Sequence, residues 1–366
     1  MASVGVRMLV ANYPPHGGGS ERQCALLARR LVDLGDRVAV VTRRLDGEQA
    51  SNGVRVRRIG APAGLRSARA ALFSMGALWD LLRERDQYDV VHCHGFEALA
   101  LVGAATRALA GKKLIVKVVT SGSFGDVTRL AAFPGGRRIA RILARAEAVL
   151  VLNDEARREV IGAGVMPEKV SLVPNGVELP AAVPGERDGD FAFCGRLVEQ
   201  KNVAGLIRAW ARTRASQQRR LVIAGDGPLR PELEQLTREL GAADRVIFRG
   251  RVDDARALVA RVQAVVLFSH AEGLSNVVLE AMAAGTPVIA SAVAGNTDLV
   301  QHDETGLLVT AGDEDALVGA IDRLASDTSL RAKLGCAARQ LAAHYDIADV
   351  ARQVHGVYER VLGTGC

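Results

Sequence analysis

The stretch SHAEGLSNVVLEAMAAGTPVIAS, residues 269–291, is the strongest indication of how this chain folds. The apolar run 264–268 comes directly before it and predicts a buried parallel strand. Ser275 is a suitable N-cap for a helix, a Gly-Thr-Pro turn ends that helix, and residues 288–290 begin the next strand. A strand, a loop and a helix in this order place the loop at the carboxyl edge of a parallel sheet, where ligands bind.

The loop and the start of this helix offer a site for phosphate together with two carboxylates. The first N–H groups of a helix are unpaired and the helix dipole is positive there, so the position suits a diphosphate. Glu272 and Glu280 are far enough apart to hold hydroxyl groups of one elongated ligand, a sugar at one end and a ribose at the other. Taken singly, Glu272 is better explained as a turn residue and Glu280 as a solvated helix residue.

Three features of the stretch occur together: the sequence EGLSN, the Glu272-x7-Glu280 spacing, and the sequence AMAAGTPV. In this combination the chain resembles family 4 of the retaining, nucleotide-sugar-dependent glycosyltransferases, whose signature is Glu-x7-Glu. The resemblance covers most of the chain and is strongest in its second half. It implies an α/β protein of GT-B architecture, with two facing Rossmann-like domains and an interdomain cleft.

The length and composition fit a globular protein of two domains. The chain has 366 residues, of which 49% are hydrophobic and 24% charged. No apolar run approaches the length of a membrane span, and the N-terminus lacks the layout of a signal peptide, so we expect a cytoplasmic protein. The five cysteines are scattered, which indicates reduced thiols rather than disulfides or a zinc site.

The positive charge lies in the first half of the chain. Residues 1–183 carry 26 Lys and Arg against 17 Asp and Glu, and the rest carries 21 against 24. A basic half suits an anionic acceptor, peripheral contact with a membrane surface, or nucleic acid; few aromatic residues and no nucleic-acid motif argue against the last. Four arginines recur on one side of a predicted helix. The simpler interpretation is a solvated face, and the alternative is a patch that binds acceptor phosphate or a membrane surface. They are Arg137, Arg138, Arg141 and Arg145.

In the first half, strands alternate with helices, which predicts a parallel, doubly wound sheet. The first strand, residues 6–11, leads into a loop that contains Gly18 and Gly19, and Ser20 is a suitable cap for the next helix. The loop lacks the G-x-G-x-x-G fingerprint, which disfavours a dinucleotide-dependent oxidoreductase. It is similar to the N-terminal glycine loop of the family, and the resemblance implies contact of Gly18 and Gly19 with the donor.

Two further loops at carboxyl ends of strands in this half carry polar residues. His92 and His94 fall on one face of a strand that ends in HCHGFE, without a third metal ligand nearby in sequence. A structural role is the better interpretation for His92, whereas His94 resembles a site-facing position of the family. Together with His94, Glu97 and Ser123 are expected on the acceptor side. Many relatives carry a histidine in this region that contacts the donor sugar. This chain has Ser123 there instead of a histidine, so the role of that histidine is not transferred.

A stretch rich in Pro, Gly and charge, residues 174–190, predicts the linker between domains. We expect an acceptor-binding domain over residues 1–180 and a nucleotide-sugar-binding domain over 185–346. A helix over about 347–366 is expected to cross back onto the first domain, as in the family.

The second domain opens with GRLVEQKN, in which Arg196 and Lys201 flank a loop after a strand. Two fixed cations can neutralise a diphosphate, and the pattern is similar to the phosphate-clamping pair of the family. The loop RGRVDD, which contains Val252, resembles the segment whose backbone meets the nucleobase.

The resemblance assigns roles to individual residues. It implies that Glu280 holds the ribose, that Glu272 and the start of the helix hold sugar and phosphate, and that Arg196 and Lys201 stabilise the leaving diphosphate. The expected catalytic residues are Glu272, His94, Arg196 and Lys201. The expected donor-binding residues are Gly18, Gly19, Arg196, Lys201, Val252, Glu272, Gly273, Leu274, Ser275, Asn276, Glu280 and Thr286. We expect no metal ion and no cofactor besides the donor.

The function expected from the sequence is transfer of a sugar, with retention, from a nucleoside diphosphate sugar to a hydroxyl group. A UDP-sugar is the favoured donor, and the acceptor is a small molecule, a glycan or a lipid-linked molecule. An excess of arginine over lysine, 41 to 6, suggests a GC-rich bacterium and favours specialised-metabolite or cell-envelope biosynthesis. A nucleotide-sugar epimerase of the same architecture is the alternative. A non-catalytic binding protein is disfavoured because Glu272 and Arg196 are both present.

Overall fold

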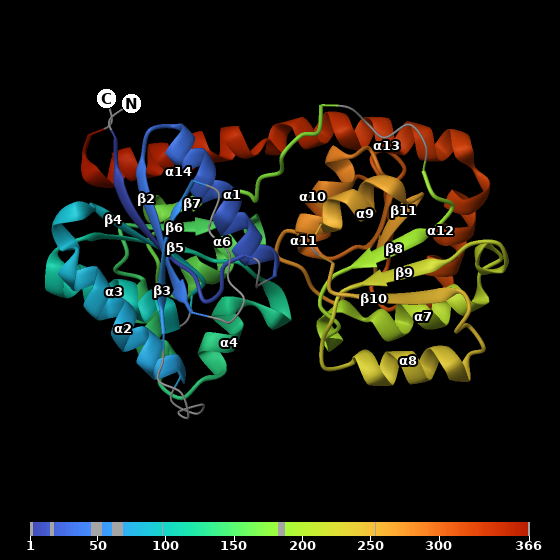
Figure 1. The fold of residues 1–366 in the computed structure, drawn as a ribbon, viewed down its shortest axis with the longest axis horizontal. Helices are drawn as coiled ribbons and strands as arrows, with labels where there is room; N and C mark the ends of the chain where they lie inside the picture. Colours follow the sequence, from blue (N-terminus) through green and yellow to red (C-terminus); the bar gives the residue numbers. More distant parts are fainter. Residues whose placement is uncertain are drawn as a thin grey trace. The chain divides into compact units, whose positions relative to one another are not determined.

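A computed structural model describes residues 3–14, 18–44, 53–60, 69–96, 98–181, 187–252 and 254–364 of the chain (Figure 1). The chain divides into two compact units. Unit 1 comprises residues 1–176 and 347–366, and unit 2 comprises residues 177–346. In the described residues, no helix is both long and apolar enough to span a membrane.

Unit 1 is built on seven parallel strands with helices on both faces of the sheet. Its strands are β1 (Gly5–Leu9), β2 (Arg37–Arg43), β3 (Arg55–Ile59), β4 (Val90–His94), β5 (Lys113–Lys117), β6 (Ala148–Val151) and β7 (Val170–Leu172). Its α-helices are α1 (Gly19–Asp33), α2 (Arg69–Arg83), α3 (Ala98–Ala110), α4 (Asp126–Ala132), α5 (Gly136–Leu143), α6 (Asp154–Gly162) and α14 (Ile347–Leu362). Short 3-10 helices are η2 (Arg85–Gln87), η3 (Gly122–Phe124) and η4 (Pro167–Lys169).

Unit 2 repeats this plan on six parallel strands. The strands are β8 (Phe191–Cys194), β9 (Leu221–Ala224), β10 (Val246–Gly250), β11 (Ala264–Leu267), β12 (Val288–Ser291) and β13 (Leu307–Val309). The α-helices are α7 (Val203–Arg212), α8 (Arg230–Glu239), α9 (Ala255–Arg261), α10 (Asn276–Ala283), α11 (Ala294–Thr297), α12 (Glu314–Ser326) and α13 (Thr328–Ala342). The 3-10 helices are η5 (Glu199–Lys201), η6 (Ala215–Gln217) and η7 (Ala343–Tyr345).

The strand order reverses at one point in each sheet. Unit 1 has the order β3-β2-β1-β4-β5-β6-β7, and unit 2 has the order β10-β9-β8-β11-β12-β13. In both units the chain therefore starts in the middle, winds to one edge, and returns to build the other half, as in Rossmann-like sheets. The predicted pair of doubly wound parallel sheets is confirmed, and the reversals lie between β1 and β4 and between β8 and β11.

Helices α1 and α14 together cover one face of the unit 1 sheet (Figure 1). Buried residues of α1, such as Leu27 and Leu31, share a core cluster with Val354 and Tyr358 of α14 and with inward residues of β1. Alternate residues of a strand point to opposite faces, so Leu9 of β1 belongs instead to the second cluster, beneath α2 to α6. The segment after unit 2 thus completes the core of unit 1.

The start of α1 differs from the sequence prediction. Gly18, not Ser20, is the N-cap, and Ser20 lies inside the helix. The Glu21 carboxylate accepts hydrogen bonds from the Gly18 N–H at 2.8 Å and from the Ser20 hydroxyl at 2.9 Å. An acidic side chain in the first turn can satisfy a free N–H and the helix dipole together, so a hydroxyl cap is not needed.

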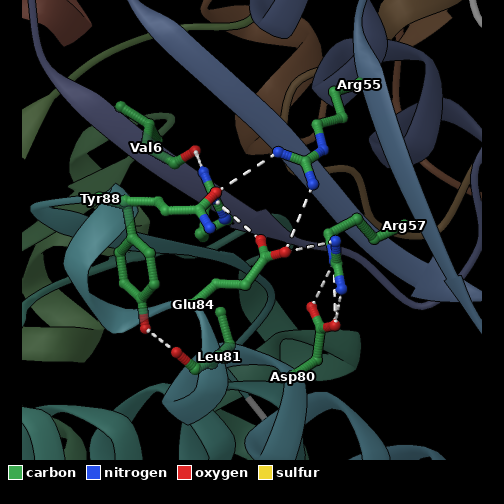
Figure 2. Close-up of polar contacts among 9 residues, drawn as sticks. Val6, Arg55, Arg57, Asp80, Leu81, Glu84 and Tyr88 are labelled. Carbon is green, nitrogen blue, oxygen red and sulfur yellow. Dashed lines mark hydrogen bonds and ion pairs between the residues drawn. The ribbon is translucent and has the colours of Figure 1, made fainter.

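Helix α2 is attached to the sheet of unit 1 by a network of ion pairs (Figure 2). From β3, Arg57 donates from its Nε to both carboxylate oxygens of Asp80, at 2.9 and 2.7 Å, and also pairs with Glu84 at 2.6 Å. Glu84 also forms ion pairs with Arg55, at 3.3 Å, and with the buried Arg7 of β1, at 3.1 Å. The two carboxylates therefore pair with the buried Arg7 and the half-buried Arg57, whose charges would otherwise lack a counterion in the sheet face, and with the exposed Arg55.

Replacing Asp80 by Asn should destabilise unit 1. Asp80 is 2% exposed, and removing its charge leaves Arg57 with only Glu84, which we expect to lower the free energy of unfolding of unit 1 by about 3 kcal/mol. Differential scanning calorimetry of the whole chain would measure the shift. Asp86→Asn is the matched control, because that side chain is 91% exposed and surface changes of this kind have little effect. Equal transition temperatures for both variants would contradict a stabilising role of the network.

Candidate active site

Two loops meet at the switch point of the unit 2 sheet. Strands β8 and β11 are paired in parallel there, and the chain leaves β8 toward η5 and leaves β11 toward α10. Open α/β sheets bind ligands at such a point, outside the carboxyl ends of the strands. The first loop carries Arg196 and ends at Lys201, and the second carries Glu272 and residues 273–275.

An ion pair between Lys201 and Glu272 joins these loops. The Lys201 Nζ lies 2.6 Å from Oε1 and 2.7 Å from Oε2 of Glu272, and the Ser269 hydroxyl donates to Oε1 at 2.6 Å. The Glu272 side chain is 6% exposed and that of Lys201 20%. A carboxylate at this depth requires such partners. Because an ammonium has three N–H donors, Lys201 can hold Glu272 and still offer a donor to a ligand.

Gln200 strengthens the connection between the loops. Its backbone oxygen accepts from the His270 N–H at 2.8 Å, and its side-chain Nε2 donates to the Ala271 oxygen at 2.9 Å. The sequence interpretation did not single out Gln200 or Ser269. Both lie inside the motifs that it used, but neither residue type there indicates a role in positioning.

Arg196 stands apart from this network. Its side chain is exposed on the loop after β8, and among the described residues its guanidinium has no ion-pair or hydrogen-bond partner. The site thus contains one cation held by a carboxylate, Lys201, and one cation that is open to an anionic ligand.

The second loop leads into α10 as predicted, and Ser275 is confirmed as the N-cap. Its side chain accepts from the Val278 N–H at 3.5 Å. Helix α11 packs closely against this loop. A Cβ on Gly295 of α11 would lie 2.2 Å from the Gly273 oxygen, so only glycine permits this contact. Close packing therefore orients the buried segment Gly273–Leu274–Ser275 without a ligand.

Glu280 lies one turn into α10 and is half-buried. It interacts electrostatically with Arg256 of α9, which also forms an ion pair with Glu178. Arg256 and Glu178 were not predicted, since neither belongs to a motif and they are far apart in sequence. Val252 is half-buried in the loop between β10 and α9, and Asp253 beside it lies outside the described residues.

Thr286 does not belong with the other predicted donor-binding residues. It is fully buried beyond the C-terminus of α10, where its hydroxyl donates to the Val259 oxygen at 2.9 Å and contacts Arg187. It directly precedes β12 and so lies at the amino edge of the sheet, whereas Ser275 and Glu272 lie at the carboxyl edge. The prediction for Thr286 was wrong because the sequence motif runs along the whole of α10. Its first residues lie at the end of the helix near the proposed donor site, and Thr286 lies beyond the opposite end.

In unit 1, His94 ends β4 next to the switch point of the sheet. Its ring stacks on that of His92, with centroids 4.6 Å apart, and His92 Nδ1 lies 2.7 Å from the Tyr358 hydroxyl. Within the described part of the chain, the buried Nε2 of both rings lacks a hydrogen-bond partner. The bond to Tyr358 agrees with the structural role expected for His92, while His94 retains an unused nitrogen.

Burial determines the charge of this group. It lowers the pKa of His92 to about 3 and the pKa of His94 well below 6.5, with further lowering by the neighbouring Lys117. Burial also lowers the pKa of Lys117 to about 8; its Nζ donates to Asn175 Oδ1 at 3.0 Å. Near neutral pH, His94 is therefore a neutral hydrogen-bonding group and not a cation.

The remaining predicted residues of unit 1 are placed as follows. Gly18 and Gly19 start α1, and Glu21 already accepts the Gly18 N–H. Ser123 is exposed in η3, in the loop after β5, and Glu97 lies outside the described residues. The locations of Gly18, Gly19 and Ser123 do not exclude the roles predicted for them.

The four arginines at and after α5 are all exposed, and Ile142 beside them is 44% exposed. A solvated face accounts for this arrangement, and a role toward membrane or acceptor stays a prediction. Across the described residues, no three His, Cys, Asp or Glu side chains are grouped as a metal site.

Comparisons with known proteins agree with this arrangement. Residues 17–180 match the model of Glycosyltransferase Family 4, and residues 188–327 match the model of Glycosyl transferases group 1. The D-inositol 3-phosphate glycosyltransferase of Acidothermus cellulolyticus is 33% identical over 94% of this chain and 86% of its own length. The chain is a family 4 glycosyltransferase. An uncharacterized glycosyltransferase of Methanocaldococcus jannaschii is 29% identical to this glycosyltransferase, over 97% of each chain.

Solved structures show the same fold as this glycosyltransferase. Anabaena HepE, crystallised in complex with UDP and glucose, has a TM-score of 0.82 at 22% identity and covers 97% of this chain and 99% of its own. The predicted GT-B architecture, two Rossmann-like domains with parallel sheets, is thereby confirmed.

Proposed function

We propose that this glycosyltransferase transfers a sugar, with retention of configuration at the anomeric carbon, from a UDP-sugar to an acceptor hydroxyl. The Lys201–Glu272 pair carries the proposal, because it places the predicted phosphate-clamping loop directly beside the first glutamate of the Glu-x7-Glu signature. The choice of uridine is supported by HepE, which has the same fold and was crystallised with UDP.

In the proposal, the donor lies across the carboxyl edge of unit 2. The N–H groups at the start of α10 and the side chains of Arg196 and Lys201 bind the diphosphate. Glu272 accepts hydrogen bonds from the sugar and Glu280 from the ribose. Negative charge builds on the diphosphate as the glycosidic bond breaks. Arg196, whose charge no carboxylate of the described residues offsets, therefore matters most at that stage.

Retention is proposed to follow a same-face route. The leaving phosphate oxygen helps to take the proton of the acceptor hydroxyl while that hydroxyl attacks the face that the diphosphate leaves. This route needs neither a protein nucleophile nor a metal ion, since the two side-chain cations stabilise the departing charge. Activity that stops when a chelator is added and returns with a divalent metal would contradict it.

Unit 1 is proposed to bind the acceptor. His94 ends β4, Ser123 follows β5, and Gly18 and Gly19 begin the helix after β1, so these four belong to segments at the carboxyl edge of the sheet. Glu97, outside the described residues, stays a predicted acceptor-side residue. As a neutral group, His94 can accept a hydrogen bond from a hydroxyl without adding a charge. We infer a small-molecule, glycan or lipid-linked acceptor, in specialised-metabolite or cell-envelope biosynthesis. No observation favours the epimerase alternative.

Glu280→Ala tests the ribose assignment. Hydrogen bonds to a charged group contribute about 1.5–3 kcal/mol each, so loss of one such bond should raise the Kd for UDP roughly ten- to a hundredfold. Isothermal calorimetry with UDP measures this directly. Glu304→Ala, an exposed glutamate of the same unit, is the matched control. Unchanged affinity of Glu280→Ala would show that Glu280 does not hold the ribose, and an equal loss in the control would indicate a non-specific effect of charge.

A further inference from the structure

A cavity of about 480 Å³ lies in unit 2, away from the proposed donor site. Its walls include Gln263 before β11, the Gly285–Pro287 turn before β12, and one side of α13. It is therefore at the amino edge of the sheet and at the C-terminal end of α10, whereas the proposed donor site is at the N-terminal end of that helix. The cavity takes no part in the proposed reaction.

Three arginines line this cavity: Arg187, Arg331 and Arg339. They come from different places: Arg187 lies in the segment before β8, and the other two lie on α13, about two turns apart. Helix α13 approaches closely because residue 335 is glycine; a Cβ there would lie 2.2 Å from the Gly285 oxygen. The described residues that line the cavity include no aspartate or glutamate.

Part of the arginine charge is used at helix ends. Arg187 Nη2 donates to the Ala284 and Gly285 oxygens at 2.9 and 3.0 Å, beyond α10. Its Nη1 donates to the Ala260 and Val262 oxygens at 3.1 and 3.2 Å, at the end of α9. Arg339 Nη1 donates to the Ala283 oxygen at 3.2 Å. Arg331 Nη1 donates to the Ala325 oxygen at 3.1 Å, at the end of α12. A purely structural explanation would therefore treat all three as C-terminal caps.

The charges do not balance on that explanation. Each helix C-terminus supplies roughly half a negative charge, so the three ends offset about one and a half of the three positive charges. Two further groups act on Arg331, the cation Arg219 and the carboxylate Asp327, and these oppose each other. Burial lowers the pKa of both Arg187 and Arg331, as expected for cations without a carboxylate in the cavity. Within the described residues, about one and a half positive charges therefore remain uncompensated.

The cavity also has hydrogen-bond donors that no described residue uses. A guanidinium has five N–H donors, and Arg339 uses one for the Ala283 oxygen and one for the Pro180 oxygen. The Thr328 oxygen accepts from Arg331 at 2.8 Å, so its own hydroxyl hydrogen can donate elsewhere. Several donors and an excess of about one and a half positive charges suit a phosphate group, which carries between one and two negative charges near neutral pH.

We propose that this cavity binds the phosphate group of a small phosphorylated molecule, independently of the donor. Arg339, Arg331 and Thr328 hold the phosphate, and Arg187 contributes charge while it caps α10. Ligand pockets generally have volumes of about 300–1,000 Å³, so the cavity has room for more than the phosphate itself. Inorganic phosphate and a phosphate ester share the chemistry recognised here, and the experiment separates them.

Cys336 supplies a local reporter. It lines the cavity and is exposed, whereas Cys24, Cys93 and Cys194 are buried. Alkylation of Cys336 by iodoacetamide, which is uncharged, would be followed by peptide mass spectrometry at increasing inorganic phosphate or glucose 6-phosphate. At a concentration of about twice Kd a third of the sites are open, so the rate there should be about threefold lower, and it should fall further as the sites fill. Potassium chloride at equal ionic strength should have no effect.

Arg339→Gln should remove the protection, and Arg331→Gln serves as a second variant if the first does not fold. Arg238→Gln, an exposed arginine on α8, is the matched control and should keep it. Protection at lower concentration by the ester assigns the cavity to a phosphorylated metabolite, and equal protection by both assigns it to inorganic phosphate. Protection that is absent, that chloride reproduces, or that survives both arginine changes would overturn the proposal.

Discussion

The Arg196→Ala variant should transfer sugar about a hundredfold more slowly than the unmodified enzyme, or slower still, while it keeps most of its affinity for UDP. Arg196 is exposed at the switch point and its charge is not offset by a carboxylate in the described structure. Its contribution is therefore expected to be largest when the diphosphate departs and carries its full charge. Steady-state kcat and KM, beside calorimetry with UDP, would separate the two stages.

Arg196 gives a clearer test than Lys201. Removing Lys201 would leave the buried Glu272 without its cation, so loss of activity could follow from a disordered loop. Arg238→Ala, on the surface of α8, controls for the loss of one positive charge. If Arg196→Ala raises only KM, the arginine binds the ground state and the transition state equally and does not assist departure of the diphosphate.

The His94→Ala variant should lose transfer activity by about a hundredfold or more, with nearly unchanged affinity for UDP. His94 has a buried nitrogen without a partner in the described residues, and its low pKa keeps it neutral. In the proposal it contacts the transferred sugar and the incoming hydroxyl, whereas residues of unit 2 hold the nucleotide. Transfer rates and UDP calorimetry on the same preparation provide both measurements.

Two comparisons make this test specific. His302→Ala changes an exposed histidine of unit 2 and should leave both quantities as they are. His94→Gln retains a hydrogen-bonding group and should recover part of the transfer rate. Normal transfer by His94→Ala would return His94 to a structural role like that of His92, and loss of UDP affinity would show that unit 1 also binds the nucleotide.

The fold and part of the site could be predicted because their signals are local. Apolar runs alternating with helical periods predict doubly wound sheets, and polar loops that follow such runs must lie at the carboxyl edge. Ser275 was predicted correctly as an N-cap because a cap depends only on the next few residues. The placement of Arg196 and Glu272 on neighbouring loops follows from the same rule.

What could not be predicted depends on contacts between distant segments. The Lys201–Glu272 pair joins residues 71 positions apart, and its geometry is set by the packing of β8 beside β11. The bond between His92 and Tyr358 of α14 joins residues 266 positions apart, from the two separate segments of unit 1. The prediction for Thr286 was wrong for the opposite reason. Thr286 is close to Glu280 in sequence, but the rest of α10 separates it from the proposed donor site.

The division of unit 1 into two segments has a consequence for the order of folding during synthesis. The ribosome completes residues 177–346, all of unit 2, before it adds Ile347–Leu362. Until then the apolar side of α1, including Leu27 and Leu31, lacks the helix that covers it. Domains commonly fold as they emerge, but here the segment made first should be the last to become fully native. A nascent chain stopped at residue 346 should therefore resist protease in unit 2 and be cleaved in unit 1.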